Sequence, residues 1–169
     1  MSQVPEQIKN RGIRQVLTNV AEVRAAVIQV MGGATRTVSI LTHDLEPDVY
    51  DHDDFLETLK KFILARTFAR VRVLILDPAR VLLSASRFVA MGRRLNSYIE
   101  FRRVMPELSG HPEAFFIADE HALVYRARAE AWEGISDTYE PAVARMYLTK
   151  FETLWNACEI EPEIRQLQI

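Results

Sequence analysis

The chain has 169 residues, of which 49% are hydrophobic and 26% charged, and its formal net charge is -2. This length and composition are typical of one globular domain with a substantial core, and they leave little room for two. No apolar run approaches the roughly 18 residues that a membrane helix requires, and Arg14, Glu22 and Arg24 interrupt the apolar stretch near the N-terminus. We therefore expect a cytoplasmic protein without a membrane span or a secretory signal. The single cysteine, Cys158, excludes an internal disulfide and a cysteine-based zinc site.

Charge is distributed very unevenly along the chain. Residues 42–59 contain seven acidic residues and no lysine or arginine, whereas residues 60–103 contain eleven basic residues and two acidic ones. Residues 104–169 contain twelve acidic residues and five basic ones. Such blocks either neutralise one another in the fold or bring a basic surface to an anionic partner. The sequence leaves both possibilities open.

In chain order, a polar lead-in over residues 1–10 precedes one domain over residues 11–169. Apolar residues recur with a helical period over residues 13–31, and Gly32 and Gly33 follow as a stop signal. This spacing predicts a helix that lies against the following sheet.

A strand, a helix and a second strand come next and form the centre of the predicted fold. Residues 37–41 alternate like a buried strand, and residues 55–63 carry an apolar stripe with helical spacing. Residues 71–76 are almost continuously apolar, which is typical of a strand near the middle of a sheet. Together the three segments predict a right-handed parallel crossover.

Polar residues follow both of these strands. His43 and Asp44 come after the first strand, and Asp77 comes after the second. Ligands of open α/β sheets bind outside the carboxyl ends of the strands, so we expect Asp44 and Asp77 at a ligand site.

An acidic segment over residues 48–54 contains four aspartates and His52. These residue types suggest a metal, but their spacing matches neither a calcium loop nor a two-histidine zinc helix. We expect Asp51 to cap the following helix, with Asp53 and Asp54 in its positive first turn, and we expect no metal site.

The next predicted helix covers residues 79–95. Arg80, Arg87 and Arg94 are seven residues apart, so on one continuous helix they would lie in a row. Such a row is either a cradle for phosphate oxygens or an ordinary solvated face. The remaining predicted elements are a half-exposed strand (98–103), a loop (104–114), a hairpin (115–125), a second loop (129–138), a long helix from Pro141 and a short helical end (162–167).

These elements, in this order, resemble one half of the phospholipase-D-like fold. The resemblance rests on the strand TRTVSILTHDL, the helix FLETLKKFILARTFA, the strand VRVLILD and the hairpin FFIADEHALVY, and it covers roughly residues 10–168. It implies an α/β fold with a mixed, mostly parallel sheet flanked by helices. More closely, the chain resembles a functionally unassigned bacterial family of this superfamily, whose members occur alone or appended to GNAT-type acetyltransferase domains.

Enzymes of the superfamily carry the signature His-x-Lys-x-x-x-x-Asp, in which the histidine is the nucleophile and the lysine binds phosphate. If Asp119 matches the signature aspartate, the histidine position falls on Pro112 and the lysine position on Ala114. Neither residue can perform its role, and shifting the register to His111 places Glu113 at the lysine position. The resemblance therefore implies a domain without the catalysis of the superfamily.

Three functions follow as hypotheses, and none of them requires a cofactor. The first is a non-catalytic module that binds a phosphate-containing ligand or nucleic acid through Arg87, Arg94, Arg102 and Arg126. The second is a protein–protein module, as a homodimer or with an acetyltransferase partner. The third is a divergent phosphodiesterase or phosphatidyl-type transferase. It would use His43 or His121, with Asp119 or Asp44 as the orienting carboxylate.

Overall fold

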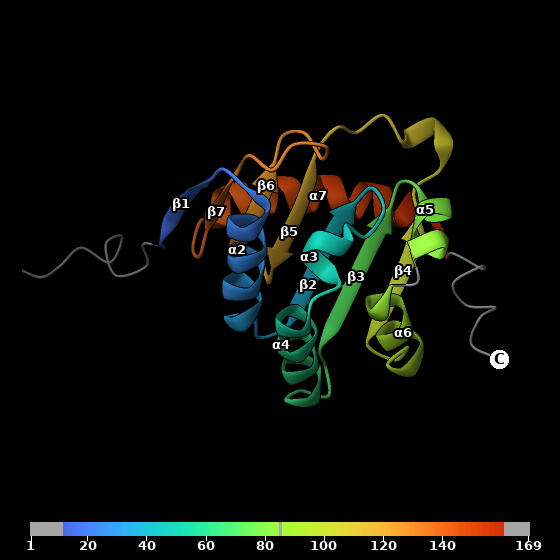
Figure 1. Ribbon diagram of the computed structural model, residues 1–169, viewed down its shortest axis with the longest axis horizontal. Helices are drawn as coiled ribbons and strands as arrows, with labels where there is room; N and C mark the ends of the chain where they lie inside the picture. Colours follow the sequence, from blue (N-terminus) through green and yellow to red (C-terminus); the bar gives the residue numbers. More distant parts are fainter. Residues whose placement is uncertain (1–11, 85, 161–169) are drawn as a thin grey trace, which may run out of the picture.

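The computed structural model describes residues 12–84 and 86–160. Its centre is an eight-stranded sheet with the strand order β1-β7-β6-β5-β2-β3-β4-β8 (Figure 1). The strands are β1 (Arg14–Leu17), β2 (Thr37–Thr42), β3 (Arg70–Ile75), β4 (Ile99–Arg103), β5 (Ala114–Ala118), β6 (Ala122–Arg126), β7 (Gly134–Asp137) and β8 (Glu159–Ile160).

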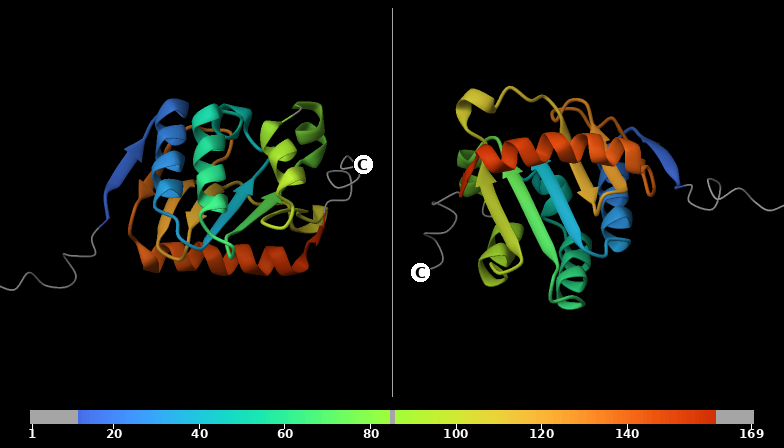
Figure 2. Two further views of the ribbon diagram at one scale, coloured as in Figure 1. Left: turned by 90° about the horizontal axis from the view of Figure 1, so that it is seen from below. Right: turned by 180° about the vertical axis from the view of Figure 1, so that it is seen from behind.

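Helices cover both faces of this sheet. The helix α7 crosses the strands on one side, here called the back face, and α2 to α6 lie on the opposite front face (Figure 2). None of the helices in the described ranges is both long and apolar enough to cross a membrane. The helices are α2 (Val20–Gly32), α3 (Pro47–Tyr50), α4 (Asp53–Leu64), α5 (Pro78–Ser84), α6 (Arg87–Arg94), α7 (Pro141–Ala157) and the short 3-10 helix η1 (Pro106–Leu108).

The α/β class and the mixed sheet are confirmed, and β3 lies inside the sheet, between β2 and β4. Parallel pairing is limited to β2 with β3 and β3 with β4, and the remaining neighbouring pairs are antiparallel. The expectation of a mostly parallel sheet is therefore wrong. Helical crossovers join β2 to β3 and β3 to β4, whereas residues 119–121 and 127–133 connect β5, β6 and β7 without a helix, as is usual for antiparallel strands.

The predicted helix over residues 13–31 is two elements, β1 and α2. Asn19 caps α2 by accepting the Glu22 N–H at 2.9 Å, and the Glu22 carboxylate accepts the Thr18 hydroxyl at 2.5 Å. This reciprocal cap fixes the start of the helix. Residues before it extend along β7, and Val16 is 72% exposed.

The predicted helix over residues 79–95 is also divided. Ser86 caps α6, with its hydroxyl accepting the N–H groups of Phe88 and Val89. Arg80 in α5 and Arg87 in α6 are therefore not on one continuous helix, and the predicted row of three arginines does not form. One further correction concerns the C-terminal part, where β7 lies within the predicted loop over residues 129–138. The predicted helix over residues 162–167 lies outside the described residues.

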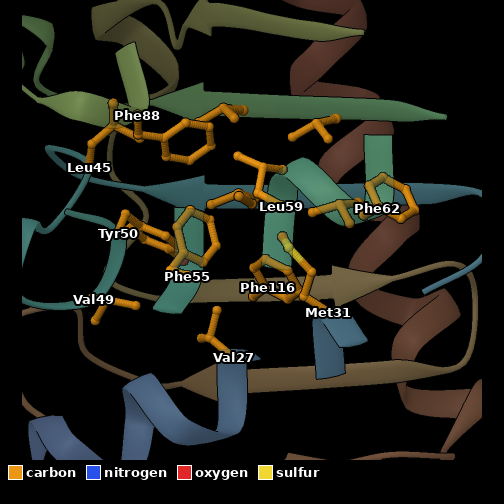
Figure 3. Packing of buried hydrophobic residues seen from close by; sticks show 14 of the residues in the cluster. Val27, Met31, Leu45, Val49, Tyr50, Phe55, Leu59, Phe62, Phe88 and Phe116 are labelled. Atoms are coloured by element: carbon orange, nitrogen blue, oxygen red, sulfur yellow. The ribbon is translucent and has the colours of Figure 1, made fainter. Parts of the chain in front are cut away.

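Large apolar side chains fill the space between the sheet and the helices. On the front face, Phe55, Phe88 and Phe116 are fully buried, and Tyr50 packs edge-on against Phe55 with ring centroids 5.1 Å apart (Figure 3). On the back face, a second cluster joins Phe115 and Leu41 to the buried side of α7. The two layers hold the sheet rigidly, so residues at its edges are positioned by the core.

Gly92 sets the distance between α6 and β4. A Cβ at this position would lie 2.3 Å from Cε2 of Phe101, whose ring is buried and packs against Phe88 at 5.4 Å. We expect Gly92→Ala to lower the free energy of unfolding by about 1–3 kcal/mol in urea denaturation, because the ring has little space to move. Gly32→Ala is the matched control, since its Cβ would meet no atom within 4 Å. It should be neutral or stabilise by up to about 1 kcal/mol; equal effects of the two substitutions would contradict this packing.

Candidate functional site

The carboxyl ends of β2 and β3 bring the predicted polar residues to one edge of the sheet. The Asp77 N–H donates to the His43 carbonyl at 2.6 Å, and the His43 Nε2 lies 3.2 Å from the His111 carbonyl oxygen. Asp44 accepts the Glu46 N–H at 3.2 Å, and its other carboxylate oxygen lies 3.6 Å from Nη1 of Arg80. His43, Asp44 and Asp77 therefore lie together, as the strand order predicts.

A buried ion pair lies beside Ala114, the residue that the sequence predicts at the position of the signature lysine. Pro112 is exposed, whereas Ala114 is buried and pairs in register with Arg126 of β6. The Arg126 guanidinium forms an ion pair with the Glu46 carboxylate, and their side chains are 4% and 9% exposed. Arg126 also donates to the carbonyls of Ala129 and Ala131 at 2.8 and 2.9 Å. The guanidinium is thus enclosed by protein groups, which include the ring of Trp132 with its centroid 4.5 Å away.

Burial dominates the electrostatics of this pair. It raises the pKa of Glu46 above its ordinary value, and the attraction of Arg126 offsets only part of that shift. Burial, together with the nearby Glu46 charge, also raises the pKa of Tyr50. The pair is an internal structural element, so Arg126 is not positioned to receive an external anion.

A second charged cluster lies on the back side of the same edge. Lys150 of α7 forms an ion pair with the buried Glu113, and the His111 Nδ1 lies 3.6 Å from the same carboxylate oxygen. Burial raises the pKa of Glu113, but the hydrogen bond and the charge of Lys150 outweigh it and hold this pKa below its ordinary value. The Lys150 ammonium group, which reaches this edge from α7, is therefore already paired with the Glu113 carboxylate.

Asp119 and His121 lie at the opposite end of the sheet. The Asp119 carboxylate accepts the backbone N–H groups of Thr35, Arg36 and Thr37 at 3.0, 2.7 and 3.0 Å. Its own backbone is left-handed, with φ of 54°. The His121 ring contacts Tyr139, with centroids 5.5 Å apart. Asp119 thus holds the start of β2, and the structure gives it no contact with either candidate histidine.

The four predicted anion-binding arginines lie in three separate places. Arg126 is internal, and Arg102 lies on the back face, where its guanidinium is 4.1 Å from the Trp155 ring and donates to the Trp155 carbonyl. Arg87 and Arg94 line one groove between α4 and α6. The structure brings together only these two of the four.

Arg87 also explains why the predicted cap of α4 is wrong. Its guanidinium binds the Asp51 carboxylate at 2.7 Å and the Asp53 carboxylate at 2.5 Å. Asp51 is therefore used between helices, and His52 occupies the cap position without a side-chain hydrogen bond. Within the described ranges, no group of three or more histidine, cysteine or acidic side chains could hold a metal ion.

The groove between α4 and α6 has a volume of about 890 Å³. Both helices lie on the front face of the sheet, with β3 behind the space between them (Figure 1). Its lining combines cationic and apolar side chains with two acidic ones. The lining residues are Asp53, Leu56, Glu57, Lys60, Leu64, Arg87, Ala90, Met91, Arg93, Arg94 and Leu95.

Sequence reasoning missed Glu46, Lys150 and Arg93. Glu46 and Arg126 are 80 residues apart in the sequence. Lys150, which pairs with Glu113, comes from α7 on the back face of the sheet. No local signal connects such pairs. Arg93 could have been included, since it precedes Arg94 in a helix that begins at a recognisable serine cap.

The fold is similar to that of solved phospholipase D family members. The structure is similar to Nuc from Salmonella typhimurium, a phospholipase D family member, with a TM-score of 0.61, 16% identity, and coverage of 89% of this chain and 98% of that chain. It is also similar to NucT from Helicobacter pylori, with a TM-score of 0.60, 12% identity, and coverage of 89% and 99%. At these identities the likeness concerns the fold alone.

A third similar structure is TrmBL2, an archaeal chromatin protein, with a TM-score of 0.64 and 16% identity. The similarity covers 95% of this chain but only 57% of TrmBL2. By sequence, residues 19–167 match the family described as Domain of unknown function (DUF7931), and the chain belongs to this family. Comparison with curated protein sequences gave no match.

Proposed function

We propose that this chain is a non-catalytic phospholipase-D-like domain that binds a phosphate-containing ligand. The observation that carries the proposal is the buried pair of Glu46 and Arg126 beside Ala114. Nucleophilic catalysis by the superfamily route needs an imidazole and a cation that face the substrate. Here proline and alanine stand at those positions, and protein atoms surround the nearest cation.

The neighbouring residues support the absence of catalysis. Lys150 is paired with Glu113, so its charge is not free to bind a phosphate in place of the missing lysine. His43 has one ring nitrogen directed at the His111 carbonyl, and among the described residues no carboxylate forms a hydrogen bond or ion pair with the ring, as a general base would require.

The binding part of the proposal is supported by charge and by fold. Most residues that line the groove between α4 and α6 belong to the basic segment over residues 60–103, and Arg93 and Arg94 are in its wall. A protein with a similar fold, TrmBL2, is described as binding DNA. The homodimer, the acetyltransferase partner, the cytoplasmic location and the extent of the domain remain predictions.

Hydrolysis assays test the absence of catalysis directly. We expect the purified chain to release no more product than buffer from bis(p-nitrophenyl) phosphate, single-stranded DNA or phosphatidylcholine. His43→Ala, His111→Ala and His121→Ala should leave this background unchanged, because none of these side chains is positioned as a nucleophile. A rate above background that disappears in one histidine variant would replace this proposal with the divergent phosphodiesterase.

A further inference from the structure

We propose that the groove between α4 and α6 binds an anionic amphiphile, a molecule that joins an acyl chain to a phosphate or carboxylate head group. This inference rests on the proposed binding function and names its site and ligand class. The groove lies on the front face, away from the edge that carries Ala114 and the pair of Glu46 and Arg126.

Three cations of the groove have no partner in the part of the chain that the structure describes. Lys60 and Arg94 are exposed, and neither makes a hydrogen bond or an ion pair with a described residue. Arg93 is more unusual, because its Nε is fully buried and still lacks an acceptor among the described residues. Two adjacent guanidinium groups are well suited to phosphate or carboxylate oxygens.

The positive charge is concentrated at one end of the groove. Near the start of the two helices, Arg87 is neutralised by Asp51 and Asp53. Towards the ends of the helices, Lys60 lies on the α4 side and Arg94 on the α6 side, and neither forms an ion pair with Glu57. An anionic head group is therefore favoured at the end where α4 and α6 finish.

The apolar lining indicates what the rest of the ligand is. Leu56 and Met91 form buried parts of the wall, and Leu64 remains 67% exposed although it lines the groove. A volume of about 890 Å³ is far larger than an isolated phosphate needs and fits a ligand with an additional apolar part. An acyl chain lying on these side chains would remove their surface from water.

The same lining argues against a nucleic acid strand. Proteins that hold single strands combine cations with aromatic side chains on which the bases stack. The residues that line this groove include leucines and methionine but no aromatic ring. The groove thus has cationic side chains that attract a phosphate but no aromatic ring on which a nucleic acid base could stack.

Isothermal titration with oleoyl lysophosphatidate, below its micelle concentration, tests the proposal. We expect saturable binding that weakens roughly tenfold or more in Arg93→Ala with Arg94→Ala, since charge-assisted hydrogen bonds are lost. Leu64→Gln should weaken binding by about threefold through the acyl chain. Circular dichroism and thermal denaturation check that each variant is folded.

Two neighbouring lysines provide a matched control for charge. Lys60 lines this groove, whereas Lys61 faces the separate space between α2 and α4. Both substitutions to alanine change the net charge equally, so we expect Lys60→Ala to weaken binding and Lys61→Ala to have little effect. Equal loss in both variants would indicate general electrostatic attraction and would overturn the site.

Other ligands separate the remaining outcomes. Glycerol phosphate, which has the head without the chain, should bind more weakly, and comparison with oleate tells whether phosphate or carboxylate is preferred. Single-stranded DNA that binds more tightly than the amphiphile and needs Arg93 and Arg94 would overturn the ligand class. If the amphiphile binds equally well to all groove variants, the proposed site is wrong but the proposed binding function stands. If no anion binds at all, both the site and the proposed binding function are wrong.

Discussion

Arg126→Met is expected to lower the free energy of unfolding by about 3–5 kcal/mol near neutral pH, measured by urea denaturation. The substitution leaves the Glu46 carboxylate in a nearly dry interior without its partner. It also frees the carbonyls of Ala129 and Ala131 from their hydrogen bonds. Breaking one side of a buried pair is more damaging than removing both sides, because an uncompensated charge remains.

The pH dependence of this loss has a definite sign. Burial raises the folded-state pKa of Glu46 above 4.5, and removing the attraction of Arg126 raises it further. A group with a raised folded-state pKa contributes its stability below the unfolded value and loses it as pH rises. The deficit of Arg126→Met should therefore be smallest below pH 4.5, where Glu46 is neutral, and should grow towards neutrality.

Two companion variants make this result specific. Glu46→Gln mimics the protonated form of Glu46, so it should be about as stable as the unmodified chain in acid, where Glu46 itself is neutral. Glu46→Met combined with Arg126→Met removes both charges and should recover most of the stability. If Arg126→Met lowers the free energy of unfolding by less than about 1 kcal/mol, and this loss does not change with pH, then water reaches the pair of Glu46 and Arg126.

Asp119→Ala is expected to lower the free energy of unfolding by about 2–4 kcal/mol in the same assay. Three backbone N–H groups at the start of β2 lose their acceptor, and alanine must adopt the left-handed conformation with φ of 54°. Hydrogen exchange at Arg36 should accelerate, because its N–H makes the shortest of these bonds.

Conservative variants separate the acceptor from the backbone conformation. Asp119→Asn keeps one acceptor oxygen and tolerates left-handed backbone, so it should lose only about 1 kcal/mol. Asp119→Gly relieves the backbone but supplies no acceptor, and it should remain close to Asp119→Ala. Glu120→Ala serves as the control, since its exposed side chain makes only a 3.9 Å contact with Arg145. Equal losses at both positions would refute the structural role of Asp119.

The central elements of this fold were predictable because their signals are local. The apolar run of β3, the helical stripe of α4 and the hairpin of β5 and β6 each lie within a few consecutive residues. β7 was not predictable, since among its four residues only Ile135 is a large apolar residue. Its strand conformation comes from pairing with β1 and β6 on either side.

The candidate site was predictable only where topology determines it. His43, Asp44 and Asp77 meet because parallel strands end at one edge of the sheet. The arginine row failed because a serine cap divides the helix between Arg80 and Arg87. Arg126 looked available in the sequence, but its counterion, Glu46, comes from a distant segment that only the folded chain brings near.

The position of α7 has a consequence for biosynthesis. This helix alone covers the back face among the described elements, and it follows β1 to β7 in the sequence (Figure 2). During translation the ribosome therefore releases the apolar back surface of the sheet, including Phe115 and Leu41, before its cover has been made. A nascent chain paused before residue 141 would expose this apolar back face to chaperones. We expect α7 to dock on the sheet only after the strands β1 to β7 have been synthesised.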